Sequence, residues 1–333
     1  MRKAMIFGIT GQDGYYLAKH LLPSGYFIFG VSRKFSNNQE ELFADYSNNI
    51  KFLEYDITDS NNINRIINDY KPDEIYNLAA QSNVFLSFKN PLYTMDVNVK
   101  GCLNILEAVR GGRLPCKIFQ AGSSEMYGKS YSVKHHIFED DSFTETFFID
   151  ENTPMKPVSP YGIAKLAAYN LVKSYREAYG IFACNGILFN HESPRRGLSF
   201  LSQKVCSYAK KLLSSNLKLL PNLKLGNIKV SRDWGYAPDF VEAMHLMLCD
   251  SKPDDYIVAT GKLHTVEDFV IKAFCVVNPF FKYTWKNYIE IDPNLYRPID
   301  VDSYCPNINK IEKHLGWKPK TTFQEMIKLM VLG

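Results

Sequence analysis

The feature that most constrains the fold of this 333-residue chain is a glycine-rich segment close to its start. Gly8, Gly11 and Gly14 lie three residues apart, after an apolar run at residues 3–8 and before a helical pattern at residues 14–22. Glycines at this spacing let the backbone turn tightly, so that the first turn of a helix meets a pyrophosphate. A glycine turn alone is a weak signal, but between a strand and a helix it predicts a dinucleotide-binding βαβ unit.

The same alternation continues through the first half of the chain. Short β-branched or aromatic runs alternate with helical patterns about every 20 to 30 residues, as parallel βαβ units require. The predicted strands span residues 3–8, 27–31, 51–55, 74–78 and 117–121, and the predicted helices span 14–22, 61–70 and 92–110. We therefore expect an α/β fold with a doubly wound, Rossmann-like parallel sheet.

Residues 128–158 break this rhythm with polar and acidic sequence, and we expect a loop there. A long helix should follow up to about residue 179, because Ser159 can cap it, Pro160 suits its first turn and Gly180 suits its exit. A strand at 181–189 completes this half of the chain.

Beyond residue 190 the alternation fades into mixed loops and helices, the helices including 200–213 and 239–248. We expect residues 1–190 to form the dinucleotide-binding domain that carries the catalytic residues. Residues 191–333 should form a smaller α/β C-terminal substrate lobe, with parts of 236–265 returning to the first domain.

Charge and apolar patterning exclude two classes of partner. The formal net charge is +4, and its lysines and arginines are scattered among acids, so nucleic acid is not expected. No apolar run reaches the roughly 18 residues of a membrane span. The first strand starts too early to leave room for a secretory signal. We expect a cytoplasmic protein.

The seven cysteines are widely spaced, lie mostly in apolar stretches and form no C-x-x-C pair, so we interpret them as reduced core residues. His135 and His136 are neighbours, without placed cysteine or carboxylate partners. We therefore expect no metal.

The end of the second predicted strand indicates which dinucleotide binds. Ser32, Arg33 and Lys34 stand where an NAD site usually carries an acid for the ribose diol, and two cations suit a 2′-phosphate. The sequence favours NADP over NAD, although ordinary surface charge would explain the same residues. Asp56 can accept from the adenine, or it only caps the next turn. The predicted cofactor contacts are Gly8, Thr10, Gly11, Gln12, Asp13, Gly14, Arg33, Lys34, Asp56, Ile57, Leu78, Ala79, Ala80, Tyr161, Lys165 and Asn190.

Tyr161 and Lys165 lie four residues apart at the start of the long helix, so both face one side of it. A tyrosine has a pKa of about 10, and a nearby ammonium together with an oxidised nicotinamide would favour its phenolate. Tyr161 could then act as a base. A Y-x-x-x-K pattern alone is common on exposed helix faces, but the glycine segment upstream makes chance a poor explanation.

Ser123 and Glu125 directly follow the strand at 117–121, at the sheet edge where doubly wound folds place their chemistry. Ser123 can hydrogen-bond a reacting hydroxyl. Glu125 can remove a carbon-bound proton and then protonate a departing hydroxide. A loop carboxylate that caps Tyr127 or pairs with a lysine is the alternative for Glu125.

Together these residues resemble the extended short-chain dehydrogenase/reductase family, and more narrowly the GDP-mannose 4,6-dehydratases, over nearly the whole chain. The motifs that carry the resemblance are I-T-G-Q-D-G at 9–14, Y-N-L at 76–78, Y-R-E-A-Y-G at 175–180, C-N-G-I-L-F-N-H-E-S-P-R-R-G at 184–197, R-D-W-G at 232–235 and L-G-W-K-P at 315–319.

The resemblance implies a redox-neutral conversion of a GDP-hexose, GDP-mannose or a close relative, to its GDP-4-keto-6-deoxy product. NADP⁺ would take hydride from C4 while Tyr161, helped by Ser123, removes the O4 proton. Glu125 would then take the C5 proton, water would leave from C6, and the hydride would return to C6. Lys165 would bind the nicotinamide ribose and lower the tyrosine pKa.

The resemblance also implies a set of substrate contacts and a homodimer or homotetramer, in which the 33–46 stretch reaches a neighbouring subunit's cofactor. The implied substrate contacts are Ser82, Ser123, Glu125, Asn190, Arg196, Lys204, Arg232 and Arg297. Arginines suit forked bonds to a diphosphate, and salt bridges in a polar lobe are the alternative.

The sequence departs from the family pattern at three places. Ser123 stands where this family usually has threonine, the 128–158 loop is longer than usual, and residues 262–292 are fewer. The first bears on the subclass, because serine at that position is also typical of sugar epimerases, and the other two leave the hexose open among mannose, a manno-heptose and N-acetylglucosamine. A nucleotide-sugar 4-epimerase or 4-reductase would share Tyr161 and Lys165, but Glu125 argues against both. A catalytically idle cofactor-sensing protein would tend to lose the tyrosine or the lysine.

Overall fold

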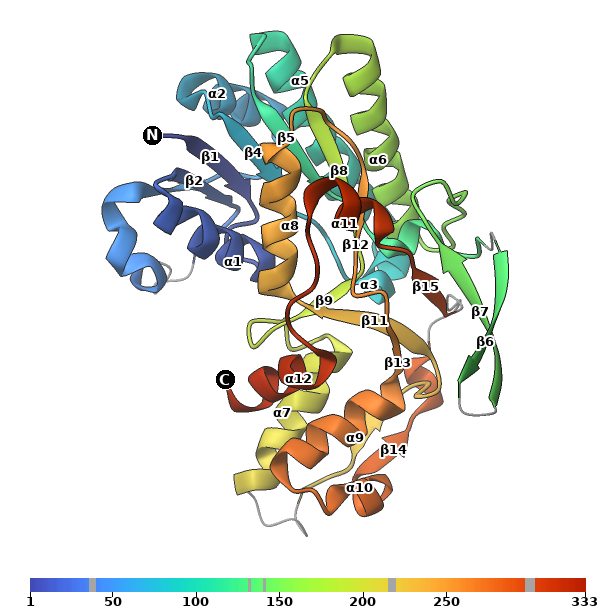
Figure 1. Ribbon diagram of the computed structural model, residues 1–333. Helices are drawn as coiled ribbons and strands as arrows, with labels where there is room; N and C mark the ends of the chain where they lie inside the picture. Colours follow the sequence, from blue (N-terminus) through green and yellow to red (C-terminus); the bar gives the residue numbers. More distant parts are fainter. Residues whose placement is uncertain (36–39, 131–132, 140–141, 215–219, 297–302) are drawn as a thin grey trace.

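The fold is known from a computed structural model, which describes residues 1–35, 40–130, 133–139, 142–214, 220–296 and 303–333. For residues 133–139, 142–146 and 214 it describes the backbone alone. The chain forms two lobes, with the N-terminal sheet above and the C-terminal lobe below (Figure 1).

A seven-stranded sheet, parallel throughout, forms the first lobe in the order β12-β8-β5-β4-β1-β2-β3. Its strands are β1 (Lys3–Phe7), β2 (Phe27–Ser32), β3 (Ile50–Glu54), β4 (Glu74–Asn77), β5 (Lys117–Ala121), β8 (Ala183–Leu188) and β12 (Tyr256–Val258). The strand order reverses between β1 and β4, and the crevice at the carboxyl ends of these strands is where doubly wound folds bind ligands. The predicted fold class is confirmed.

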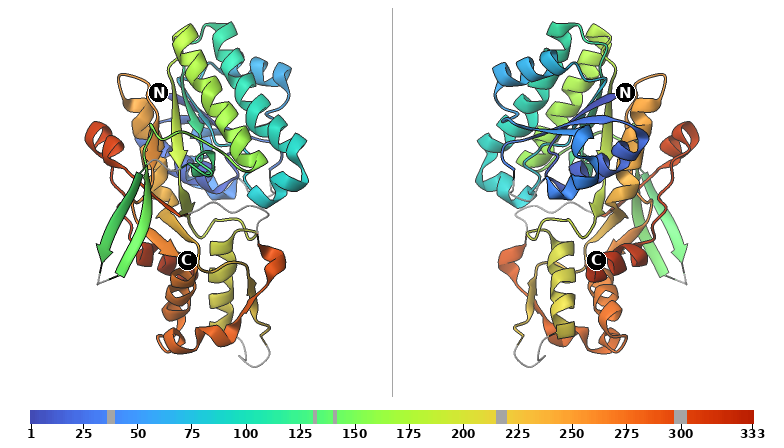
Figure 2. Two further views of the ribbon diagram at one scale, coloured as in Figure 1. Left: turned by 90° about the vertical axis from the view of Figure 1, so that its right-hand side faces the viewer. Right: turned by 90° about the vertical axis from the view of Figure 1, so that its left-hand side faces the viewer.

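Helices cover both faces of this sheet (Figure 2). On one face α1 (Gln12–Leu21) packs against α8 (Ala237–Cys249). The other face carries α2 (Ser60–Tyr70), α5 (Gly101–Gly112) and α6 (Pro160–Tyr179), with α3 (Val84–Lys89) and α4 (Pro91–Met95) packed against α6. A π-helical turn at Asp96–Lys100 joins α4 to α5, so the segment predicted as a helix at 92–110 is helical throughout, with one π-helical turn inside it.

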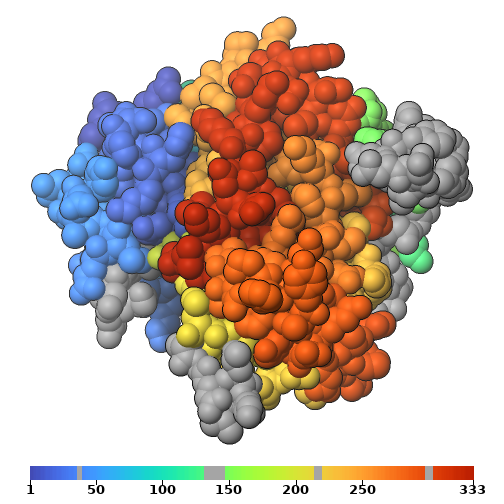
Figure 3. Space-filling view, turned by 60° about the horizontal axis from the view of Figure 1, so that its bottom comes forward, coloured from blue at the N-terminus to red at the C-terminus, as the bar shows by residue number. Residues whose placement is uncertain are grey.

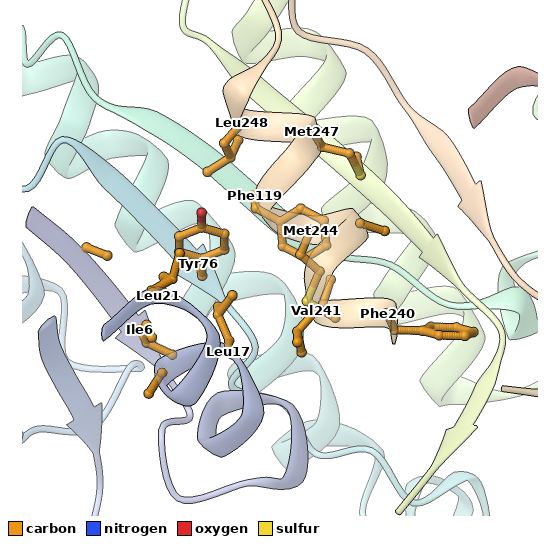
Figure 4. Close-up of a cluster of buried hydrophobic side chains, with 14 of the residues drawn as sticks. Ile6, Leu17, Leu21, Tyr76, Phe119, Phe240, Val241, Met244, Met247 and Leu248 are labelled. Atoms are coloured by element: carbon orange, nitrogen blue, oxygen red, sulfur yellow. The ribbon is translucent and has the colours of Figure 1, made fainter. Parts of the chain in front are cut away.

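Burial of apolar side chains on both sheet faces explains these layers. Between the sheet and the α1–α8 pair, Ile6, Leu17, Phe119 and Met244 are all fully buried, and Figure 4 shows them converging from the two helices and the strands. Removing such side chains from water is the main favourable term in folding. Residues 237–258 therefore belong to the packing of the first lobe, although they follow the start of the second.

The C-terminal lobe is a smaller α/β unit with its own apolar core around Trp234, Phe269 and Phe274. Its strands are β9 (Asn190–Glu192), β10 (Leu223–Leu225), β11 (Ser231–Tyr236), β13 (Leu263–Thr265) and β14 (Ile289–Ile291). Its helices are α7 (Leu201–Ser214), α9 (Val266–Val277), α10 (Phe281–Thr284) and α12 (Phe323–Leu332), while α11 (Asn309–Leu315) packs on β12. Residues beyond about 250, in orange and red, occupy the centre of the face seen in Figure 3, with N-terminal residues in blue at its left.

The loop expected at 128–158 is instead largely a β-hairpin, which corrects that prediction. β6 (Val133–Glu139) and β7 (Ser142–Ile149) pair antiparallel, and β15 (Tyr304–Pro306) adds to β7 in parallel. The hairpin stands out from the side of the molecule (Figures 1 and 2). The sequence pattern did not reveal this hairpin, because its residues are polar and because main-chain bonds to a segment 157 residues away complete the small sheet.

Two further findings concern composition. All seven cysteines are free, and five are buried, but Cys249 is exposed and Cys275 is half-buried, so the expectation of core cysteines is wrong for these two. Both lie on helices that turn one side to solvent. Within the described ranges, no helix is long and apolar enough to cross a membrane.

Candidate active site

A cavity of about 970 Å³ lies at the carboxyl ends of the sheet strands and is lined by residues of both lobes. It brings together most of the predicted site. Its lining includes Gly8, Thr10, Gly11, Gln12, Asp13, Gly14, Arg33, Ile57, Leu78, Ala79, Ala80, Ser82, Ser123, Glu125, Tyr161, Lys165, Asn190, Arg196 and Lys204. Gly8 and Asn190, which are 182 positions apart in sequence, thus share one space, because parallel strands all end at the same sheet edge.

Three predicted residues lie elsewhere, and the position of a fourth is not described. Lys34 and Asp56 do not line the cavity. Asp56 Oδ1 accepts from the Thr58 backbone N at 2.9 Å and from Thr58 Oγ1 at 2.8 Å, so this carboxylate caps a turn, which was the alternative for it. Arg232 lines a separate cavity of about 20 Å³ beside Glu125. Arg297 lies outside the described residues.

The glycine turn is shaped by backbone contacts that leave no room for a side chain. Gly8 has φ +86°, and a Cβ there would lie 2.9 Å from Ala79 N. A Cβ on Gly14 would lie 2.3 Å from Gly8 O. Among the described residues, no side chain caps the α1 N-terminus at Gly11, so its first N–H groups are available to an anion. These residues fit a dinucleotide pyrophosphate.

Two side chains of this turn contact the segment after β8. Gln12 Nε2 donates to His191 O at 3.0 Å, and Gln12 Oε1 accepts from Ser193 Oγ at 2.7 Å. Asp13 Oδ2 lies 2.9 Å from His191 Nε2. The side chains of Gln12 and Asp13 therefore connect α1 to the start of the second lobe. Since these side chains already have partners, we expect the two residues to contact a cofactor through their backbone.

The four predicted catalytic residues come from two neighbouring elements. On α6, Ser159 Oγ accepts from Gly162 N at 3.0 Å, and this cap fixes the first turn that carries Tyr161. Lys165, one turn later, donates from Nζ to Ala121 O at 2.8 Å, which anchors α6 to the end of β5.

After β5 the chain enters a 3₁₀ turn at Ser124–Met126. Ser123 Oγ accepts from Glu125 N at 3.2 Å and so starts this turn. Because Glu125 and Tyr161 line the same cavity, the turn and the first turn of α6 present their side chains to a common space.

Burial opposes the ionisation that the predicted chemistry needs. Desolvation raises the pKa of Tyr161 to about 12, and the hydrogen bond with Ser123 offsets only part of that rise. Burial also lowers the pKa of Lys165 to about 8. Lys165 Nζ lies 5.8 Å from the centre of the Tyr161 ring. The expectation that Lys165 lowers the tyrosine pKa is therefore not visible in the protein by itself.

Comparison with known proteins identifies the family to which this chain belongs. The family described as GDP-mannose 4,6 dehydratase matches residues 5–330. The chain belongs to the GDP-mannose 4,6-dehydratase family. A relative named GDP-mannose 4,6 dehydratase 2, from Arabidopsis thaliana, is 45% identical over 98% of this chain and 85% of its own. The human GDP-mannose 4,6 dehydratase is 41% identical over 98% and 90%, respectively.

Solved structures of more distant proteins share the fold. A UDP-glucose 4-epimerase from Thermotoga maritima, solved with UDP-glucose, has a TM-score of 0.80 at 23% identity and covers 99% of this chain and 97% of its own. A dTDP-glucose 4,6-dehydratase from Bacillus anthracis, solved in complex with NAD, has a TM-score of 0.80 at 21% identity and covers 99% and 96%. At these identities the likeness concerns the fold alone.

In this member of the GDP-mannose 4,6-dehydratase family, Arg33 is held against an aromatic ring. Its guanidinium lies 5.6 Å from the centre of the Tyr93 ring, and its Nη1 donates to the Tyr93 hydroxyl. Both side chains line the cavity. The contact keeps a fixed positive charge next to the end of β2.

Sequence reasoning missed His191 as a site residue. Its Nδ1 lies 2.7 Å from Phe189 O and its Nε2 faces Asp13, so both ring nitrogens meet acceptors and the imidazolium form is favoured. Burial works against this charge, but Asp13 outweighs it and raises the pKa of His191. The N-H-E-S-P-R-R-G motif after a strand end was a signal that would have found it.

Arg195 was missed as well. Its guanidinium lies 3.9 Å from the centre of the Tyr15 ring, and it lines the cavity beside the predicted Arg196. Arg196 in turn lies 3.0 Å from Glu192. Within the described part of the chain, no group of three or more His, Cys, Asp or Glu side chains is arranged to hold a metal ion.

Proposed function

We propose that this protein is a GDP-sugar 4,6-dehydratase that acts on GDP-mannose or a close relative with NADP as cofactor. The observation that carries the proposal is one cavity, in a chain of the GDP-mannose 4,6-dehydratase family, that collects Ser123, Glu125, Tyr161 and Lys165 beside the glycine turn. The product is the GDP-4-keto-6-deoxy sugar, formed with loss of one water.

Tyr161 is the base for the sugar O4 proton. Ser123, hydrogen-bonded to Tyr161, orients the same hydroxyl. A bound nicotinamide dinucleotide supplies the acceptor that takes hydride from C4 and later returns it to C6. Because burial holds the pKa of Tyr161 at about 12, removal of the O4 proton requires positive charge beside the ring, and Lys165 carries part of it. With a pKa of about 8, Lys165 is mostly protonated at neutral pH.

Glu125 performs the dehydration. Once C4 is a ketone, the C5–H bond is acidified, and the Glu125 carboxylate takes that proton. The same carboxyl then protonates the C6 hydroxyl, the C6–O bond breaks, and water leaves. Neither a 4-epimerase nor a 4-reductase needs a base at C5, so this residue favours the dehydratase over both.

The substrate contacts proposed for the cavity are Ser82, Asn190, Arg196 and Lys204, with Arg232 in the adjoining cavity. Cations from α7 and from the segment before it suit a diphosphate. We also propose the two-domain division at residue 190, and assembly as a homodimer or homotetramer. Light scattering of the purified protein tests the assembly, and a monomer at micromolar concentration would contradict it.

Mass spectrometry of incubations with GDP-, UDP-, CDP- and dTDP-sugars tests the function. We expect a GDP-hexose to lose the mass of one water without added reductant. Products of unchanged mass with inverted C4 would instead identify an epimerase, and stoichiometric consumption of NADPH would identify a reductase.

Thermal unfolding tests the choice of cofactor. We expect NADP⁺ to raise the unfolding temperature more than NAD⁺, since a ligand at 100 times its Kd stabilises by about 2.7 kcal/mol. The Arg33→Ser variant should lose most of the difference, because the proposed partner of the 2′-phosphate is gone. Equal shifts for both dinucleotides in the parent protein would contradict NADP preference.

A further inference from the structure

Tyr304 approaches the catalytic turn from the far end of the sequence. Its hydroxyl donates to Ser124 O at 2.8 Å, and its side chain is buried. Ser124 begins the 3₁₀ turn that carries Glu125. A residue 179 positions after Glu125 therefore bonds to the backbone immediately before it.

Aromatic side chains pack against one another next to the same turn. The Tyr304 ring meets the Tyr127 ring edge-on, with centroids 6.1 Å apart, and the Phe189 ring at 6.2 Å. These three rings and the fully buried Met126 belong to one apolar cluster. The Tyr127 hydroxyl donates to Asp150 O at 2.8 Å, so the residues just after Glu125 are fixed as well.

Tyr304 also borders the same space as Glu125. Both line the cavity of about 20 Å³ that adjoins the main one, together with Arg232 and Asp233. A polar cavity of this size holds about one water molecule. Tyr304 thus forms part of the wall beside the carboxylate, in addition to bonding its turn.

The β6–β7 hairpin sets the position of Tyr304. β15 pairs with β7, with Tyr304 opposite Phe147, and Asn307 N donates to Ile149 O at 2.8 Å. Strand pairing of this kind fixes the register of β15 and therefore the direction of its side chains. The hairpin and the chain after residue 303 together support the turn at Ser124–Met126.

We propose that Tyr304 is a positioning residue that holds Glu125 in place for removal of the C5 proton. This inference rests on the proposed function. Three hydrogen bonds restrain the short turn: Glu125 N to Ser123 Oγ, Tyr304 OH to Ser124 O, and Tyr127 OH to Asp150 O. Glu125 cannot move far while these bonds persist. Tyr304 bonds to the turn and not to α6, which carries Tyr161. Because α6 packs against this turn, loss of the bond should slow oxidation at C4 as well, but less than it slows removal of the C5 proton.

The Tyr304→Phe variant separates these two steps, because it keeps the ring packing and removes the bond to Ser124 O. Two rates are measured with GDP-mannose: reduction of the bound nicotinamide on mixing, and loss of the C5 hydrogen read as its exchange with deuterium from solvent. We expect C5 exchange and product formation to fall about threefold to tenfold, the change that one lost hydrogen bond produces. The reduction rate and the KM should stay within twofold of the parent's values. The thermal unfolding temperature should fall by no more than a few degrees, because one hydrogen bond contributes about 1 kcal/mol to stability.

Tyr76→Phe is the matched control. Its buried hydroxyl donates to Glu74 Oε2 at 2.8 Å in β4, away from the cavity, so its loss should leave C5 exchange unchanged. C5 exchange in Tyr304→Phe within twofold of the parent would overturn the inference. Equal loss of both rates with a lower unfolding temperature would also overturn it, since that marks a purely structural residue. A parent protein that forms no dehydrated product overturns the proposed function itself, and that is established before either variant is compared.

Discussion

At the residue scale, the environment of each ionisable group decides what it can do. Tyr161 and Glu125 share a cavity, but burial raises the pKa of Tyr161 to about 12, whereas the 3₁₀ turn presents Glu125 at the cavity wall. The tyrosine therefore needs added positive charge to act as a base near neutral pH.

Replacement of Glu125 tests this division of roles. We expect Glu125→Gln to bind the dinucleotide with parent affinity and still reduce it on GDP-mannose, while formation of the 4-keto-6-deoxy product falls about 100-fold or more. The physical reason is that glutamine is nearly isosteric but cannot accept the C5 proton. Stopped-flow absorbance and product mass spectrometry measure the two steps. Tyr161→Phe is the comparison that should block reduction, and unchanged dehydration in Glu125→Gln would remove this residue from the mechanism.

At the element scale, the strand–turn–helix unit around Gly8 and Gly14 depends on close backbone contact. A Cβ on Gly14 would lie 2.3 Å from Gly8 O and 2.6 Å from Ile9 Cα, and backbone atoms cannot move aside. The same unit is joined to the second lobe by the Asp13–His191 ion pair. The Gly14 contact and the Asp13–His191 ion pair can be tested separately.

Gly14→Ala should lower the free energy of unfolding by about 2 kcal/mol or more, because overpacking in a tight core forces the backbone to shift. Gly111→Ala is the matched control: Gly111 lies in α5 with nothing within 4 Å of its added Cβ, so alanine should stabilise by up to about 1 kcal/mol. Urea denaturation of the three proteins measures both changes. Equal stability of the two variants would contradict the contact.

The Asp13–His191 pair should make stability depend on pH. Burial tends to raise the pKa of Asp13, but the charge of His191 outweighs it and holds this pKa at about 2, below the ordinary 3.8. The Asp13 contribution is therefore present above about pH 3.8 and lost as pH falls. The pKa of His191 is raised above 6.5, so its contribution is present below pH 6.5 and lost as pH rises through the raised value.

His191→Asn should thus cost most between about pH 4 and 6.5, roughly 3 kcal/mol for breaking a buried pair. The free energy of unfolding of parent and variant, measured by urea denaturation from pH 3 to pH 9, tests this window. A difference that stays constant over that range would mean that the two side chains are not an ion pair.

At the scale of the whole molecule, packing joins segments that are distant in the chain. Phe240 of α8 stacks on His191, with ring centres 4.7 Å apart, and meets Trp317 edge-on at 6.0 Å. Trp317 Nε1 donates to Asp239 O at 2.9 Å. The sheet lobe, the segment after β8 and the chain near its C-terminus therefore meet around one ring.

Phe240→Ala should lower the free energy of unfolding by about 3 to 5 kcal/mol, because it leaves a cavity where the two lobes join. Phe280→Ala is the control, since Phe280 is 76% exposed and its loss should change stability by less than about 0.5 kcal/mol. Denaturation followed by both fluorescence and circular dichroism measures the effect. Similar costs for the two variants would show that Phe240 does not join the lobes.

Local sequence patterns were enough to predict the first lobe and to select residues that line one cavity. β5 and α6 match their predicted ranges, and the glycine turn has the predicted strand before it and helix after it. These features are local: apolar runs, caps and glycine spacing act over a few residues, so the sequence displays them directly. Ser123, Glu125, Tyr161 and Lys165 could be chosen because each stands at the end of a strand or the start of a helix.

The amino-acid sequence by itself determined which segments form strands and helices in the first lobe and which side chains reach the carboxyl edge of its sheet. Only the tertiary structure decided what those side chains meet: that Asp13 pairs with His191, that burial raises the pKa of Tyr161, and that Tyr304 bonds to the turn of Glu125. The β6–β7 hairpin belongs to the same class, since β15 completes it from the far end of the chain. Contacts between distant segments depend on how the whole chain packs, and no local pattern encodes them.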